Sequence, residues 1–418
     1  MLSVNDAKKK DVNGILLFSV FVLTIIFLLT RQKLLIGAIL MITLYQYIFV
    51  GEKLIINKAS KNFINFWIYY LVVTLFYNFI LYRTIDMAIL MEFFGRLAIV
   101  VASFIIGSAI NKNEKFLILY RNFGFLICIL GLVEYVLKEN IIYRFYNFFD
   151  SAPIVIYSES YRIYTIFAHP IVFGTFLIPL FWIKKEYPFK SIILDKIFLV
   201  MIILNICFTQ SRSCWIALGI TLILNIFLSS SKFEFKKICL NKYIYMIVST
   251  CLLLFIIIFF RKPIFKLILS IVNRFSVVLA NDSMDGSRVQ RLGSIKVVFL
   301  YISKHLVSGI FGSGLGFSTG FMKKYSPTKG FLSIDNQYMH SLLEVGMIGV
   351  YFFVNIILYL VKNLKLFYKE KKTKIGALSS ISILICIFFF VGFSWYPILC
   401  MFTIFISFLN VEDKIEGD

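Results

Sequence analysis

Four arginines lie beside apolar stretches of this 418-residue chain, where a fixed positive charge has a use. They are Arg162, Arg212, Arg288 and Arg291. The planar guanidinium group matches phosphate oxygens with parallel hydrogen bonds and keeps its charge beside a low-dielectric boundary. The set is therefore a candidate clamp for a lipid-linked pyrophosphate. The simpler reading is that each arginine reaches out to lipid head groups.

Arg212 is the strongest candidate for a functional role among the four arginines. It lies in "FTQSRSCWIAL", where a very short connection joins two apolar runs. Gln210, Ser211 and Ser213 beside it offer further hydrogen bonds. An ionisable side chain at membrane depth indicates a functional site by default.

The stretch "DNQYMHSLLEVGMIG", residues 335–349, places polar residues at the start of an apolar run. Asn336, His340 and Glu344 are four apart and so share one helical face. An unpaired charge inside a span costs about 2.5 to 3.5 kcal/mol, so this face is predicted to meet a wet or protein-lined cavity. His340 could act as a base or bind a pyrophosphate, or be structural. Asp335 and Asn336 are also good helix caps, worth about 1 kcal/mol.

Other polar residues in apolar runs are open to structural readings. Glu92 and Arg96 are four apart and most simply form a pair within one helix. Arg121 and Glu134 are ambiguous between structure and function. His169 precedes a proline and is predicted to break or cap a helix there.

The composition places these residues in a membrane protein, because 60% of the chain is hydrophobic and 16% is charged. Apolar runs of about 17 to 25 residues, long enough to cross a bilayer, recur along it. We predict an all-α fold of about twelve transmembrane helices. The predicted spans begin at Gly14, Leu34, Phe63, Met87, Phe116, Thr165, Ser191, Cys214, Tyr243, Tyr338, Ile375 and Tyr396.

The formal net charge of +21 is explained by membrane topology rather than by nucleic-acid binding. About twenty Lys and Arg fall in the N-terminus and the loops on one side of the predicted spans, against roughly seven in the short loops on the other side. The basic side is expected to face the cytoplasm, together with both termini. The seven cysteines lie mostly in apolar runs without a His/Cys cluster, so no metal site is predicted.

One predicted outer segment, residues 261–337, is too long for a bare connector within the single membrane domain of residues 1–418. Long loops of this kind usually carry function. Inside it, "SRVQRLGSIKVVFLYISKHL" has apolar residues near helical spacing and is predicted to lie flat on the membrane surface. The next stretch, "VSGIFGSGLGFSTGF", is predicted to be a flexible turn, and its glycines do not match a nucleotide-binding loop.

From about Arg162 onward, the sequence resembles the O-antigen ligase and polysaccharide polymerase superfamily of the Wzy/WaaL type. The resemblance rests on five pieces in a fixed order, flanking and within the large loop. They are "RIYTIFAHPIVFGTFL", "TQSRSCWIAL", "GSRVQRLGSIKVVF", "HLVSGIFGSGLGFS" and "DNQYMHSLLEVGMIG".

The resemblance implies a GT-C-like, inverting glycosyltransferase on the outer face of a bacterial plasma membrane, without metal or cofactor. A sugar chain on undecaprenyl pyrophosphate would be attacked by an acceptor hydroxyl, and lipid pyrophosphate would leave. Arg212 matches a family arginine near the pyrophosphate, and Arg291, with Arg288 as its alternative, matches the loop arginine. The expected substrate-binding residues are Arg162, Arg212, Arg288, Arg291 and Asn336. Expected partners are the lipid-linked oligosaccharide, the bilayer, a flippase and a chain-length regulator, with no nucleic acid.

Asp335 departs from the pattern of the superfamily. Its ligases usually carry His-Asn where this chain has Asp335-Asn336, and the nearest histidine is displaced to His340. The departure favours a polymerase over a ligase to lipid A, and it leaves Asp335 and His340 as candidates for the catalytic base. A ligase to another acceptor remains an alternative. So does a polysaccharide flippase or transporter, whose site would lie near the membrane midplane at broken helices.

Overall fold

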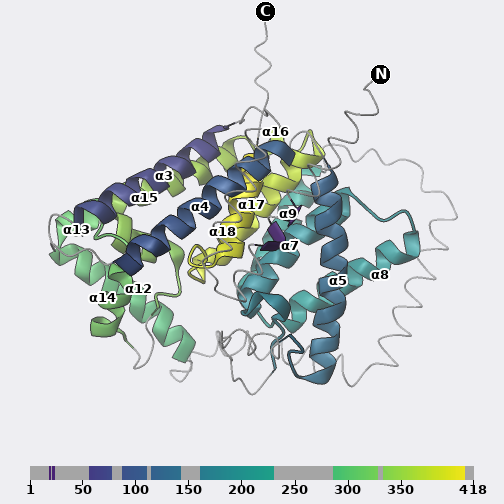
Figure 1. Ribbon diagram of the computed structural model, residues 1–418, viewed down its shortest axis with the longest axis horizontal. Coiled ribbons are helices and arrows are strands. Elements are labelled where there is room, and N and C mark those ends of the chain that lie inside the picture. Colours follow the sequence, from purple (N-terminus) through teal and green to yellow (C-terminus); the bar gives the residue numbers. More distant parts are fainter. Residues whose placement is uncertain are drawn as a thin grey trace, which may run out of the picture.

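The computed structural model is a bundle of α-helices (Figure 1). It describes residues 18–19, 21–23, 56–77, 87–110, 114–142, 161–229, 286–327 and 333–409. The regular structure of these residues is entirely helical, which confirms the all-α prediction. The helices are α3 (Lys58–Leu75), α4 (Met87–Ile110), α5 (Lys115–Leu137), the 3-10 helix η2 (Thr165–Phe167), α7 (Pro170–Glu186), α8 (Ile192–Phe208), α9 (Arg212–Ser229), α12 (Gly286–Lys304), α13 (Leu306–Phe311), α14 (Phe317–Tyr325), α15 (Gln337–Lys362), α16 (Leu364–Phe367), α17 (Lys371–Phe388) and α18 (Tyr396–Ser407).

Within the described ranges, four helices are long and apolar enough to cross a membrane. They are Met87–Ser108, Lys115–Leu137, Arg212–Ser229 and Gln337–Lys362. The predicted total of twelve spans is not confirmed. The helices at five predicted spans are not among these four, namely those predicted at Phe63, Thr165, Ser191, Ile375 and Tyr396. The spans predicted at Leu34 and Tyr243, and most of the one at Gly14, lie outside the described residues. Residues 261–285 of the large loop also lie outside them, so the loop as a whole stays a prediction.

Two of the shorter helices are enclosed on nearly every side by others. Every residue of α18 from Pro397 to Ser407 is buried. So is almost all of α7, from Pro170 to Lys184. A helix that is apolar all round is stable where it meets protein or lipid on every face. This position explains why α18, at 12 residues, can be shorter than a bilayer is thick.

Small residues let α4 and α18 approach closely. A Cβ atom added at Gly107 would lie 2.5 Å from Cβ of Ser407 and 3.1 Å from the carbonyl oxygen of Ile404. Small residues at helix contacts are typical of membrane bundles, where van der Waals packing drives association. Gly107 is therefore required for this contact between the two helices.

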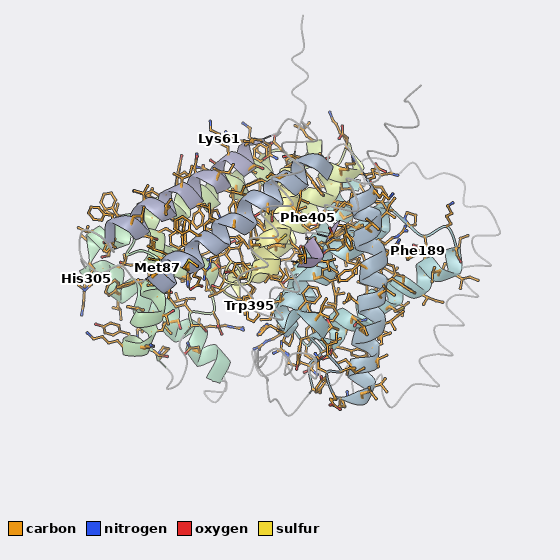
Figure 2. All side chains as sticks on the ribbon, viewed as in Figure 1. Lys61, Met87, Phe189, His305, Trp395 and Phe405 are labelled. Carbon is orange, nitrogen blue, oxygen red and sulfur yellow. The ribbon has the colours of Figure 1, made fainter. Side chains whose placement is uncertain are left out.

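One end of the bundle is held by ion pairs, and we call it the Lys184 end. Lys184 pairs with Asp195 at 2.7 Å, which joins the end of α7 to the start of α8. Lys374 pairs with Glu186 at 2.7 Å, which joins the start of α17 to α7. In Figure 2, Lys61 marks this end, and Trp395 lies toward the opposite one.

The opposite end, which we call the Arg212 end, holds the first residues of α7, α9, α15 and α18. The Tyr338 hydroxyl, at the start of α15, donates to the carbonyl of Leu384 near the end of α17, at 3.1 Å. The loop 389–395 between α17 and α18 closes this end, because its Phe393 N–H donates to Gln337 Oε1 at 2.9 Å. Helices α12, α13 and α14 gather beside the first half of α15 (Figure 1).

Replacing Gly107 by alanine should lower the thermal unfolding temperature of the detergent-purified protein, because a Cβ there collides with α18. Overpacking of this kind costs about 1 to 3 kcal/mol. The matched control is Gly219→Ala, also in a helix, where an added Cβ meets nothing within 4 Å. It should leave the melting temperature unchanged or slightly higher. Equal melting temperatures for the two variants would contradict the close α4–α18 contact.

Candidate functional site

Helix α15 is broken at Gly346, whose φ of 63° and ψ of −170° are not helical. The break frees two backbone carbonyls, which accept hydrogen bonds from the turn after α13. Ser313 N–H donates to the carbonyl of Leu343 at 3.0 Å, and Gly314 N–H donates to that of Glu344 at 2.9 Å. Backbone groups at membrane depth must be satisfied inside the protein, so the turn and the break depend on each other.

The turn and the broken helix touch through their main chains. A Cβ added at Gly346 would lie 2.3 Å from the carbonyl oxygen of Ile310. A Cβ added at Gly312, which has a φ of 91°, would lie 2.4 Å from the carbonyl oxygen of Glu344. The glycines here hold a close-packed junction, so the flexible turn predicted from the sequence is instead a fixed one.

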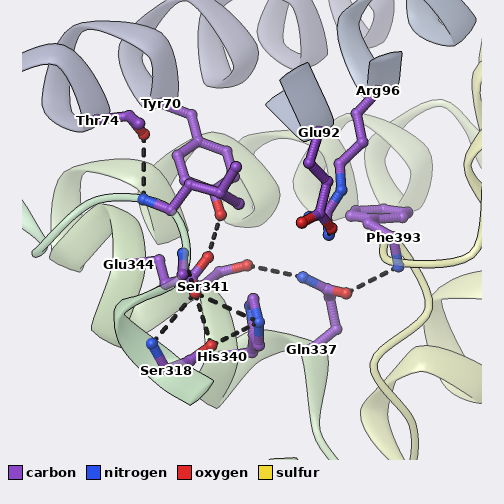
Figure 3. Close-up of polar contacts among 12 residues, drawn as sticks. Tyr70, Thr74, Glu92, Arg96, Ser318, Gln337, His340, Ser341, Glu344 and Phe393 are labelled. Carbon is purple, nitrogen blue, oxygen red and sulfur yellow. Dashed lines mark hydrogen bonds and ion pairs between the residues drawn. The ribbon is translucent and has the colours of Figure 1, made fainter. Parts of the chain in front are cut away.

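Glu344 is the centre of a buried polar cluster (Figure 3). Its side chain is 1% exposed. Oε2 accepts the hydroxyl of Tyr70 from α3, and Oε1 accepts the N–H groups of Gly316 at 3.1 Å and Ser318 at 3.2 Å. Oε1 also accepts the Ser318 hydroxyl at 2.6 Å. A carboxylate from α15 thus caps the start of α14, which has no cap of its own.

His340 belongs to the same cluster. Its Nε2 lies 2.9 Å from Ser318 Oγ and 3.6 Å from Glu344 Oε1. The Ser318 hydroxyl donates to Glu344, so His340 Nε2 is expected to be the donor to Ser318 Oγ. The prediction that the His340–Glu344 face meets a protein-lined interior is confirmed, with Tyr70 and Ser318 as the lining groups.

Asp335 and Arg291 lie within electrostatic reach of each other, because α12 packs on the segment before α15. Gln290 Nε2 donates to the carbonyl of Ser333 at 3.1 Å. Asp335, half-buried, accepts the Ser333 hydroxyl at 3.2 Å. Burial raises the pKa of the Asp335 carboxyl above its ordinary value, while the nearby Arg291 charge and the Ser333 hydroxyl lower it.

Asn336 is the N-cap of α15, which is the structural role predicted for it as the alternative to substrate binding. Its side-chain oxygen accepts the N–H groups of Tyr338 at 2.9 Å and Met339 at 3.1 Å. This contact orients the first turn of α15 behind Asp335. Arg288 lies on α12, but its side chain is outside the described part of the structure, so its predicted role is untested.

The second arginine region lies where α7 starts and α8 turns into α9. Arg162 Nε donates to the carbonyl of Thr209 at 2.9 Å, in the turn that leads to Arg212. The turn includes Gln210, which has a positive φ of 49°. Arg162 also lies within electrostatic reach of the His169 ring. The fold thus brings Arg162 to the turn that precedes Arg212, and their joint binding of a pyrophosphate stays a prediction.

Glu134 binds the backbone of this second region, as Glu344 binds the backbone of the first. Its carboxylate is 2% exposed and accepts the N–H groups of Tyr164 at 3.1 Å and Thr165 at 2.8 Å. It also accepts the Tyr161 hydroxyl at 2.9 Å. Of the two roles left open for Glu134, the structure shows the structural one: Glu134 anchors the segment that carries Arg162.

The loop 389–395 connects the two regions. His169 stacks on Phe390 with ring centroids 4.7 Å apart, and its ring lies 5.3 Å from Trp395. The same loop binds Gln337 through the Phe393 N–H, two residues after Asp335. The two arginine regions therefore occupy the same end of the bundle and share one loop.

The other polar residues singled out in apolar runs make contacts within the bundle. Glu92 and Arg96 form the predicted ion pair within α4. Arg121 donates to the carbonyls of Tyr187 and Pro188, each at 2.9 Å, at the Lys184 end. His169 Nδ1 accepts the Ile171 N–H at 3.1 Å and caps α7, as predicted.

Sequence reasoning missed Tyr70, Thr74 and Ser318 as partners of the site. Thr74 Oγ1 accepts the Leu315 N–H at 3.1 Å, so α3 as well as α15 fixes the glycine turn. The available signal was Glu344 itself, because a buried carboxylate requires donors from elsewhere. The identity of these donors depends on how the helices pack, because Tyr70 and Glu344 are 274 residues apart in the chain.

The fold and the site define a helical, multi-pass membrane protein with a polar, arginine-bearing region at one end. Residues 197–354 match a family model described as O-antigen ligase. The predicted resemblance to the O-antigen ligase and polysaccharide polymerase superfamily is thus confirmed over this part of the chain, and the match supports a function of the ligase or polymerase type. The matched range contains Arg212, Arg291 and Asp335, while Arg162 precedes it. No curated protein matches the chain.

Replacing Glu344 by alanine should loosen the turn before α14. The substitution leaves buried N–H groups of Gly316 and Ser318 without an acceptor, at about 1 to 3 kcal/mol for each group. Hydrogen exchange followed by mass spectrometry should then show faster exchange in residues 313–320. Glu139→Ala, at an exposed position, is the control. Unchanged protection in Glu344→Ala would contradict the capping role.

Proposed function

We propose that this protein is a polysaccharide polymerase. It transfers an oligosaccharide from undecaprenyl pyrophosphate to a sugar hydroxyl of a lipid-linked acceptor. The observation that carries the proposal is the packing of α12 on the segment before α15, which puts Arg291 within electrostatic reach of Asp335 at the Arg212 end. The O-antigen ligase match over the same residues supports a lipid-linked oligosaccharide as the substrate.

The pyrophosphate is proposed to bind between the arginines of the two regions. Arg162 is fixed through Nε on the Thr209 carbonyl, and Arg212 begins α9 one turn further on. Arg291, with Arg288 on the same helix, approaches from α12. Guanidinium groups that are already positioned stabilise charge on a leaving pyrophosphate without reorganisation.

Asp335 is the better candidate for the general base. Its carboxylate is half-buried at the start of α15 and its burial raises its pKa, which makes it a stronger proton acceptor. His340, in contrast, is engaged through Nε2 with Ser318 and Glu344. His340 is therefore proposed to position the first turns of α15 rather than to take the proton.

The proposed reaction is a direct displacement with inversion at the anomeric carbon. The acceptor hydroxyl loses its proton to Asp335 and its oxygen forms the new glycosidic bond. The bond from the anomeric carbon to the pyrophosphate oxygen breaks, and the electron pair leaves with the lipid pyrophosphate. The arginines take up that charge, so no metal ion is required in this scheme.

The proposed setting is a bacterial plasma membrane, with the Arg212 end facing outward and both termini in the cytoplasm. The ion-paired lysines of the Lys184 end suit the cytoplasmic side of such a protein. A flippase would deliver the lipid-linked repeat units to the outer face, and a chain-length regulator would set the product size. Transfer to a different acceptor, which would make the protein a ligase, is the nearest alternative.

One observation favours a transporter as a second candidate. Broken helices at membrane depth are typical of transport sites, and α15 is broken at Gly346. The freed carbonyls here are already occupied by Ser313 and Gly314, however, so they do not offer an ion site. Purified protein in vesicles with a lipid-linked oligosaccharide on one face separates the two: a polymerase elongates it, and a transporter moves it unchanged.

Arg212→Ala and Arg291→Ala should each reduce polymer formation by about 10² to 10³-fold, the usual effect of removing a charge-stabilising donor. Polymer is measured as the ladder of products on a gel, together with the amount of protein in the membrane. Lys304→Ala, an exposed residue on the same helix as Arg291, is the matched control and should keep the full ladder. Normal ladders from both arginine variants would exclude the clamp.

The pH dependence of turnover should follow the ionisation of the Asp335 carboxyl. A base must be ionised, so the rate falls as the pH drops through its pKa. Arg291 lowers that pKa, and Arg291→Gln should therefore move the acid limb of the residual activity to higher pH. Lys304→Gln should leave the limb in place. An acid limb that Arg291→Gln does not move, or that survives in Asp335→Asn, would rule out Asp335 as the base.

A further inference from the structure

The ion pair on α4 faces the first turns of α15 across the interior of the site. Arg96 is 6% exposed, whereas the side chain of Glu92 is 53% exposed. Figure 3 shows both side chains pointing from α4 toward Gln337, with His340 beside Gln337 and Tyr70 descending from α3. Glu344, Arg96 and Glu92 lie close enough to His340 to act on its ring electrostatically.

Arg96 has a donor that the described protein does not use. Its NH2 group binds Glu92, but its buried Nε has no hydrogen-bond partner among the described residues. A buried donor of this kind costs about 1 to 3 kcal/mol if it stays unsatisfied. The Nε–H group is therefore available to a ligand that reaches this cluster.

The net charge of this cluster indicates which class of ligand it would bind. One guanidinium, Arg96, stands against two carboxylates, Glu92 and Glu344, so the cluster does not carry the positive charge that a pyrophosphate requires. Carboxylates, an imidazole, an amide and a guanidinium together donate and accept, which suits the hydroxyl groups of a neutral sugar. Tyr396 lies within electrostatic reach of Arg96 and adds an aromatic side to the space.

We propose that Glu92, Arg96 and His340 form a sugar-binding subsite for the acceptor, separate from the arginines that bind the pyrophosphate. The proposal rests on the polymerase function above. His340 lies in the first turn of α15, and Asp335 lies in the segment directly before that helix. The subsite would hold the acceptor sugar so that its hydroxyl reaches Asp335.

Two probes separate the subsite from the pyrophosphate clamp. One is undecaprenyl pyrophosphate without sugar, and the other is the repeat-unit oligosaccharide released from its lipid by mild acid. Binding of each to the full-length protein in nanodiscs is measured by calorimetry. Arg96→Gln should weaken oligosaccharide binding by about tenfold and leave undecaprenyl pyrophosphate binding unchanged. Arg212→Ala should give the opposite pattern.

The matched control is Arg121→Gln, which removes an arginine from the Lys184 end and should change neither affinity. Glu92→Gln, at a half-exposed side chain, carries the same expectation as Arg96→Gln and serves if that variant does not fold. Wild-type protein that binds neither probe would overturn the polymerase function itself. Lipid binding with no oligosaccharide binding, unchanged oligosaccharide affinity in both variants, or loss of lipid binding in Arg96→Gln would overturn only the subsite.

Discussion

The requirement that every buried polar group finds a partner shapes the site more than any other constraint. Helix α15 breaks at Gly346 inside an apolar bundle, and its freed carbonyls must accept hydrogen bonds from protein. The glycine turn after α13 supplies them, and Glu344 in return accepts the N–H groups of Gly316 and Ser318. The turn and the broken helix therefore satisfy each other's backbone groups and fix each other's position.

Two buried glutamates bind backbone N–H groups in the same way. Glu134 on α5 accepts two backbone N–H groups and a tyrosine hydroxyl from the segment before α7, as Glu344 does for the segment before α14. Glu134 fixes the segment that carries Arg162, and Glu344 fixes the turn before α14. An intramembrane glutamate would be expected to act directly in chemistry. In this protein both glutamates instead accept backbone N–H groups of nearby loops.

The loop 389–395 links these two rigid regions, with His169 stacked on one part of it and Gln337 bound to another. The result is a site with two electrostatic characters at one end of the bundle. Arginines dominate near the α8–α9 turn, while the α4–α15 interior balances one guanidinium against two carboxylates. A substrate with an anionic pyrophosphate and a neutral sugar chain matches this division.

The sequence by itself determined that the chain is an all-α membrane protein, that the polar residues of 335–349 share a face, and that Asn336 and His169 could cap helices. These features depend on local periodicity, charge and capping chemistry, which a single segment carries in full. The total number of spans and the role of Arg288 stay predictions. Only the tertiary structure decided that Tyr70 is a partner of Glu344 and that the glycine turn is fixed, because these contacts join segments far apart in the chain. Their geometry arises from how the helices pack, and no local pattern encodes it.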